Sequence, residues 1–93
     1  MEKGKSVCVF YVATIWMWGK GTIERVERNN EILARVTFKE MIKEANECEY
    51  GQGRYIITLS EEWIDEEGNY EFFQVREKKT IVNGTYSHIN RVL

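Results

Sequence analysis

The hydrophobic pattern is strongest in residues 6–18, SVCVFYVATIWMW, which contain no charged residue, no glycine and no proline. β-Branched and aromatic residues dominate the segment, and these residue types fit a pleated sheet. Apolar residues occupy both parities instead of alternating with polar ones, so we expect both faces of the strand to be covered. The pattern predicts a strand on which the rest of the chain packs.

The same segment also predicts where in the cell the protein is located. A membrane-spanning helix needs about 20 apolar residues, and residues 6–18 are too few. A secretory signal would end in small residues at a cleavage site, whereas this segment ends in Trp16, Met17 and Trp18. We therefore expect a cytoplasmic protein that does not contact the membrane.

The length of this segment also predicts self-association. Thirteen residues in a straight strand span about 43 Å, but a globule of this chain length has a diameter of only about 32 Å. A chain this short buries only about 60 % of its unfolded surface. The strand must therefore bend or extend into a partner. We expect a homodimer or higher oligomer with Phe10, Tyr11 and Val12 at the interface.

Residues 22–36 fit two structures. A helix would need polar Glu27 and Asn30 on its apolar face. A hairpin around Asn29 and Asn30 pairs Val26 with Leu33, and it also pairs oppositely charged residues. The hairpin is the favoured prediction for this segment.

A capping-box pattern follows, in which Thr37 and Glu40 can each bond to the other's backbone amide. An apolar stripe at helical spacing comes next, formed by Phe38, Met41, Ile42 and Ala45. The pattern predicts an amphipathic helix over about residues 38–48.

The remaining chain reads as strands and turns. Residues 54–64 and 70–77 predict two strands joined by a hairpin loop at residues 65–69. Asn83 and Gly84 predict a further hairpin between residues 80–82 and 85–89. The expected fold is α+β, with residues 1–93 as a single domain. It comprises an antiparallel β-sheet of five to six strands with one amphipathic helix, about 38–48, on one face.

Composition excludes several classes of function. A net charge of −2 argues against direct nucleic-acid binding. Cys8 and Cys48 form neither a disulfide framework nor a metal site, and we expect buried, reduced thiols. His88, the only histidine, has no neighbours in the spacing of a triad or zinc site. The sequence therefore indicates a protein that is not an enzyme and needs no cofactor or metal.

Two features indicate binding. Aromatic residues make up 13 % of the chain, and aromatic rings beside arginine stack on planar bases, although each ring could instead be plain core. We predict an oligomer that sequesters a planar, nucleotide-like small molecule near a subunit interface. The alternative is an inhibitor or adaptor, of the kind that phages encode, that docks on a basic protein through the acidic hairpin of residues 61–71. The predicted ligand-binding residues are Trp16, Trp18, Arg54, Tyr55, Trp63 and Arg76.

Overall fold

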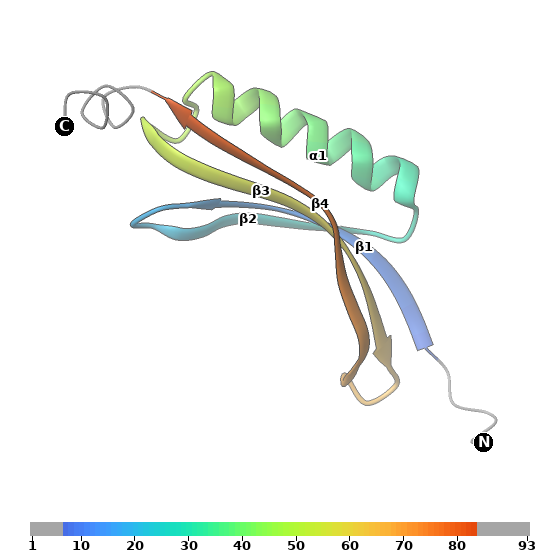
Figure 1. The fold of residues 1–93 in the computed structure, drawn as a ribbon. Helices are drawn as coiled ribbons and strands as arrows, with labels where there is room; N and C mark the ends of the chain where they lie inside the picture. Colours follow the sequence, from blue (N-terminus) through green and yellow to red (C-terminus); the bar gives the residue numbers. More distant parts are fainter. Residues whose placement is uncertain (1–6, 84–93) are drawn as a thin grey trace.

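One four-stranded antiparallel sheet and one helix make up the described part of the chain, residues 7–83 of the computed structural model (Figure 1). The elements are β1 (Val7–Met17), β2 (Gly21–Arg28), α1 (Glu31–Asn46), β3 (Gly53–Asp65) and β4 (Tyr70–Asn83). The strand order is β2-β1-β3-β4, and α1 packs on one face. The predicted α+β class is confirmed, with four strands in residues 7–83 instead of five or six.

β1 lies inside the sheet, as the apolar run predicted. It pairs with β3 along its whole length and with β2 from Tyr11 to Met17. The outer edge of β1 before Tyr11 therefore has no partner strand among residues 7–83. β4 continues unbroken to Asn83; the hairpin predicted around Gly84 lies outside the described residues.

The core lies between α1 and the sheet face that it covers. Alternate residues of β1 and β3 point to this face, and the predicted stripe of α1 packs on them. The buried apolar side chains of this cluster are Ala13, Ile15, Met17, Ala34, Phe38, Met41, Ala45, Tyr55, Ile57, Leu59 and Ile81. The placement of the apolar stripe on the sheet is confirmed.

The helix begins at Glu31, earlier than predicted. Asn30 is its N-cap, and its Oδ1 accepts hydrogen bonds from the amides of Ile32 and Leu33 at 2.8 and 3.2 Å. Thr37 lies inside the helix, where its hydroxyl donates to the Leu33 carbonyl at 3.3 Å. The predicted hairpin over residues 22–36 and the predicted capping box are therefore wrong. A short polar side chain such as Asn30 serves a turn and a helix cap by the same local hydrogen bonding.

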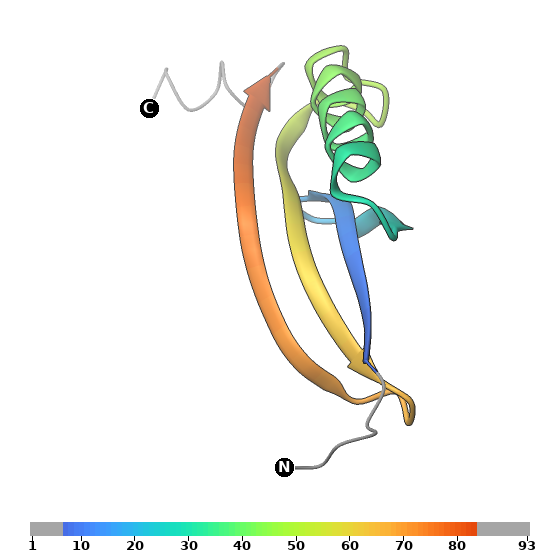
Figure 2. The same ribbon diagram turned by 90° about the vertical axis from the view of Figure 1, so that its right-hand side faces the viewer.

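The sheet is curved, and part of it extends beyond the helix (Figures 1 and 2). The start of β1 and the β3–β4 hairpin project past the N-terminal end of α1. The molecule measures 59 × 23 × 17 Å with a radius of gyration of 16.2 Å, against about 12 Å for a globule of this chain length. The projection leaves both faces of one end of the sheet without a covering helix within residues 7–83, so the expected cover on both faces of β1 is not found there.

Candidate binding site

The six predicted ligand-binding residues lie at opposite ends of the sheet. Trp16 is opposite Ile56 in β3, next to Arg54 and Tyr55, whereas Trp63 is opposite Val9. Seven residues along β1 separate the two positions, which is about 23 Å. Arg76 lies at the Trp63 end. The structure therefore does not gather the six residues into one site.

The end of the sheet that carries Trp16 contributes mainly to the hydrophobic core. Trp16 and Trp18 contact edge to face with ring centroids 6.0 Å apart, and Trp18 is exposed. Tyr55 is fully buried beneath α1, and its hydroxyl donates to the Gly51 carbonyl. Burial raises the pKa of Tyr55. The Tyr55 side chain serves the core in this structure and presents no surface to a ligand.

The Trp63 end brings two predicted residues together with two that the sequence analysis missed. The rings of Trp63 and Phe72 contact with centroids 5.2 Å apart. The indole nitrogen of Trp63 donates to Glu61 at 2.7 Å, and Arg76 forms an ion pair with the same carboxylate. We call Glu61, Trp63, Phe72 and Arg76 the overhang site, because they lie on the projecting end of the sheet.

Strand register builds the overhang site. Glu61 and Trp63 are two residues apart in β3 and share a face, and Phe72 of β4 lies directly opposite Trp63. Opposite residues of antiparallel strands have Cβ atoms about 5 Å apart. The hairpin predicted at residues 65–69 brings Trp63 and Phe72 near each other, but the register shift between Trp63 and Ile64 means that the sequence alone could not align the two residues.

The overhang site can bind a flat group. Trp63 is 38 % exposed and Phe72 39 %, so each ring keeps apolar surface that a planar ligand can cover. The Arg76 guanidinium adds a cation beside the rings. The Glu61 carboxylate, which holds both Trp63 and Arg76, orients these groups and can accept a hydrogen bond from a ligand amine.

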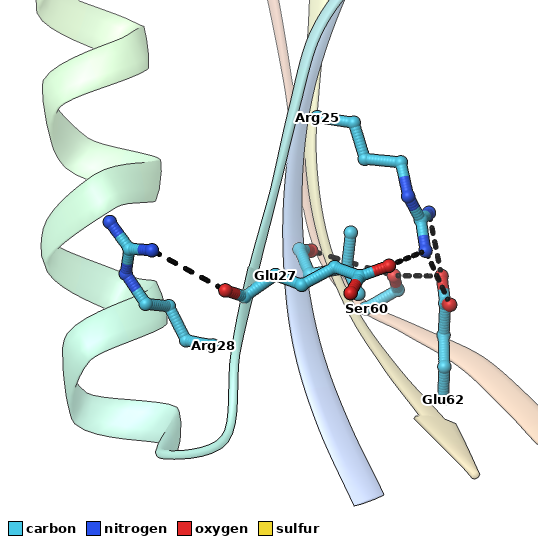
Figure 3. Close-up of polar contacts among 6 residues, drawn as sticks. Arg25, Glu27, Arg28, Ser60 and Glu62 are labelled. Atoms are coloured by element: carbon cyan, nitrogen blue, oxygen red, sulfur yellow. Dashed lines mark hydrogen bonds and ion pairs between the residues drawn. The ribbon is translucent and has the colours of Figure 1, made fainter. Parts of the chain in front are cut away.

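A second polar cluster lies on the sheet face opposite α1 (Figure 3). Glu62 is only 2 % exposed, and Arg25 of β2 donates to its two carboxylate oxygens at 3.0 and 3.3 Å. Arg25 also pairs with Glu27 at 2.8 Å, and the Ser60 hydroxyl lies 3.5 Å from the Glu62 carboxylate. The hydrogen bond with Glu62 raises the pKa of Arg25. Because its members bond to one another, this cluster ties β2 to β3.

The acidic hairpin presents fewer free carboxylates than the sequence indicated. Glu61 and Glu62 pair with arginines, and the carboxylate of Asp65 accepts the amides of Glu67 and Asn69 at 2.9 Å. The predicted loop at residues 65–69 is confirmed, with Gly68 at φ +87°. The exposed acidic side chains of the whole hairpin, residues 61–71, are Glu66, Glu67 and Glu71.

The predicted interface residues of β1 point to different faces. Val12 is fully buried, Tyr11 packs against the core beside α1, and Phe10 is half-buried on the opposite face. Val12 therefore presents no surface to a partner in this structure, whereas Tyr11 keeps part of its side chain exposed.

The predicted burial of both thiols is wrong. Cys8 is exposed and Cys48 is half-buried, and both are free. Cys8 lies near the start of β1, before β2 begins to pair with it. Cys48 follows the helix and adopts φ +55°, in the region where helices commonly end.

Comparisons with protein-family models, with curated proteins and with solved structures found no match for this chain. α1, the only helix within residues 7–83, is not long and apolar enough to span a membrane. His88 lies outside the described residues. The functional argument therefore rests on the geometry of the overhang site and of the surfaces around it.

Proposed function

We propose that this chain is a non-catalytic, homo-oligomeric binding protein that holds a planar, nucleotide-like small molecule at the overhang site. The observation that carries the proposal is the half-exposed Trp63–Phe72 pair with Arg76 beside it. Stacking on an aromatic side chain contributes about 1–3 kcal/mol per base, which is enough to select flat ligands over flexible ones.

The positions of the four side chains of the overhang site define how a planar ligand would bind. A purine or pyrimidine stacks on Trp63 and Phe72, and its exocyclic amine donates to Glu61. Arg76, already oriented by Glu61, faces the electron-rich ring or a phosphate. Glu61 and Arg76 form an ion pair with each other, and both groups serve to hold the ligand.

Tryptophan fluorescence during titration with AMP, adenosine, GMP and UMP tests the proposal. We expect saturable quenching by at least one of them, and about a tenfold loss of affinity in Arg76→Ala. Trp63→Phe should remove the quenching, whereas Trp16→Phe should keep it. Arg54→Ala, at the other end of the sheet, is the matched arginine control and should bind as the wild type does. A wild-type protein that responds to none of the four compounds would contradict the proposal.

A second candidate function is docking on a basic protein through the hairpin tip. Glu66 and Glu67 are exposed at the turn, and this turn projects farthest from α1 (Figure 2). Because exposed charges act over about 10 Å at 0.1 M salt, capture of a poly-lysine peptide should weaken as salt rises.

The charge-reversed variant Glu66→Lys/Glu67→Lys should lose this capture. Glu40→Lys/Glu49→Lys changes the net charge equally at other exposed positions and should retain it. Equal loss in both variants would show that net charge, and not the hairpin tip, binds the peptide.

A further inference from the structure

β4 is an edge strand whose exposure is unusual. Every residue from Tyr70 to Val82 except Ile81 is exposed. Five of the eleven exposed large hydrophobic side chains in the described part of the chain belong to β4: Tyr70, Phe72, Phe73, Val75 and Val82. The outer edge of β4 has no partner strand within residues 7–83. A long, apolar, uncovered edge is a template for another strand.

We infer that a second copy of the chain pairs antiparallel along this edge, β4 against β4, and brings its Lys79 to the overhang site. The inference rests on the proposed function, because it completes the same site. Two-fold pairing of identical strands forms a closed dimer in which each copy presents the same residues. The two sheets would then join into one.

A β-bulge in β4 selects the register. Leu59 is opposite Glu77 and Ser60 is opposite Val75, so Arg76 is an extra residue in β4. Glu77 shares the face of buried Leu59, and Arg76 reaches Glu61 on that same face. These consecutive residues therefore both lie on the α1 side, whereas in a regular strand consecutive residues alternate.

Directly opposite residues of paired strands must share a face. A two-fold axis between Arg76 and Glu77 satisfies this condition, because it sets helix-side residues against helix-side residues on both sides of the bulge. The same axis pairs residues 72–81 of one strand with residues 72–81 of the other, and the condition holds throughout this range. An axis through Val75 would instead set Phe73, on the opposite face, against Glu77.

Charge supports the same register. Arg76 lies opposite the partner subunit's Glu77, and this pair occurs twice. Val75 lies opposite the partner subunit's Lys78, and Gln74 lies opposite the partner subunit's Lys79, so no two like charges face each other. Neither lysine forms an ion pair within residues 7–83. Both line an open groove of about 610 Å³ between β4 and α1, with Phe38 and Ile42 on the α1 side, and the partner strand would cover this groove.

The partner lysine completes the site. Gln74 shares a face with Phe72 and is two residues away, about 7 Å along the strand. The partner subunit's Lys79 therefore arrives beside the Trp63–Phe72 rings, on their face of the sheet. An ammonium group there suits a phosphate, so a nucleotide should bind more tightly than its nucleoside.

Sedimentation velocity of two variants of Val75 tests the interface. The wild type should sediment at twice the 11.0 kDa chain mass. Val75→Lys places lysine opposite lysine twice and should raise the dimer dissociation constant about tenfold, whereas Val75→Glu should not raise it. Val75 is 44 % exposed, so each single chain should tolerate both changes. A monomeric wild type, or equal dissociation constants for the two variants, would overturn the interface.

Hydrogen exchange of the wild type gives a second measurement without substitutions. Amides of β4 that face outward should exchange more slowly as protein concentration rises. Slow exchange that is independent of concentration in a monomer would mean that the chain covers its own edge, and this would overturn the second copy as the occupant.

The lysine is tested with AMP and adenosine. Lys79→Gln should weaken AMP binding about tenfold and leave adenosine binding and the dimer unchanged. AMP binding that survives the substitution would overturn the role of Lys79. A dimer of the expected register that binds neither compound would instead contradict the proposed function and leave the interface standing.

Discussion

The Glu62 carboxylate is almost fully buried on the sheet face opposite α1, and Arg25 compensates for its burial. A buried carboxylate that loses its partner retains the cost of its desolvation. Arg25 is itself 37 % exposed, so solvent screens part of the interaction. The pair therefore sets how β2 attaches to the sheet more than it adds net stability.

Arg25→Ala should lower the free energy of unfolding by about 2 kcal/mol, measured by urea denaturation. The double variant Arg25→Leu/Glu62→Leu should recover most of this loss, because apolar side chains of similar size need no charged partner. A double variant that is less stable than Arg25→Ala would contradict this account.

Tyr50 is the residue whose titration reports on the fold. Its hydroxyl donates to Glu24 at 3.2 Å and to Glu44 at 3.4 Å. Burial, reinforced by the two carboxylates, raises the pKa of Tyr50 to about 12. The contribution of Tyr50 to stability should be complete below about pH 10 and should be lost as the pH rises toward 12, because deprotonation is easier in the unfolded chain. Thermal unfolding of Tyr50→Phe between pH 9 and 12 should show a weaker decline than the wild type.

At the scale of elements, the start of α1 depends on Asn30. Asn30→Ala should lower the free energy of unfolding by about 1 kcal/mol, and Asn30→Asp should not. Thr37→Ala should change it by less than about 0.5 kcal/mol, because Thr37 caps nothing. Urea denaturation of the three variants measures this difference. A larger effect at Thr37 than at Asn30 would place the start of the helix near residue 37 after all.

At the scale of the whole molecule, side chains in the core between α1 and the sheet should contribute more to the free energy of unfolding than side chains on the projecting end of the sheet. Phe38 of α1 is 5 % exposed in the core, whereas Phe72 of β4 is 39 % exposed on the projecting end of the sheet. Phe38→Ala should cost about 3 kcal/mol of unfolding free energy, and Phe72→Ala less than about 1 kcal/mol. Phe72→Ala should nevertheless weaken ligand binding. Equal losses of stability would show that the projection is part of the core.

The sequence by itself determined those elements whose signals lie close together along the chain. β1, β3, the loop between β3 and β4, and the apolar stripe of α1 follow from periodicity and turn residues, because those signals act over a few residues. Trp63 and Arg76 also entered the predicted site from residue type alone. Asn30 was misread because a cap and a turn share one local chemistry.

Only the tertiary structure decided which distant residues meet. Register shifts in β3 and β4 set Phe72 against Trp63 and turn Arg76 toward Glu61, whereas Tyr55 became core because α1 covers its end of the sheet. A slip of one residue moves every side chain of a strand to the other face, and no local pattern specifies where such a bulge falls. The site therefore depends on strand pairing, which joins residues that are far apart along the chain.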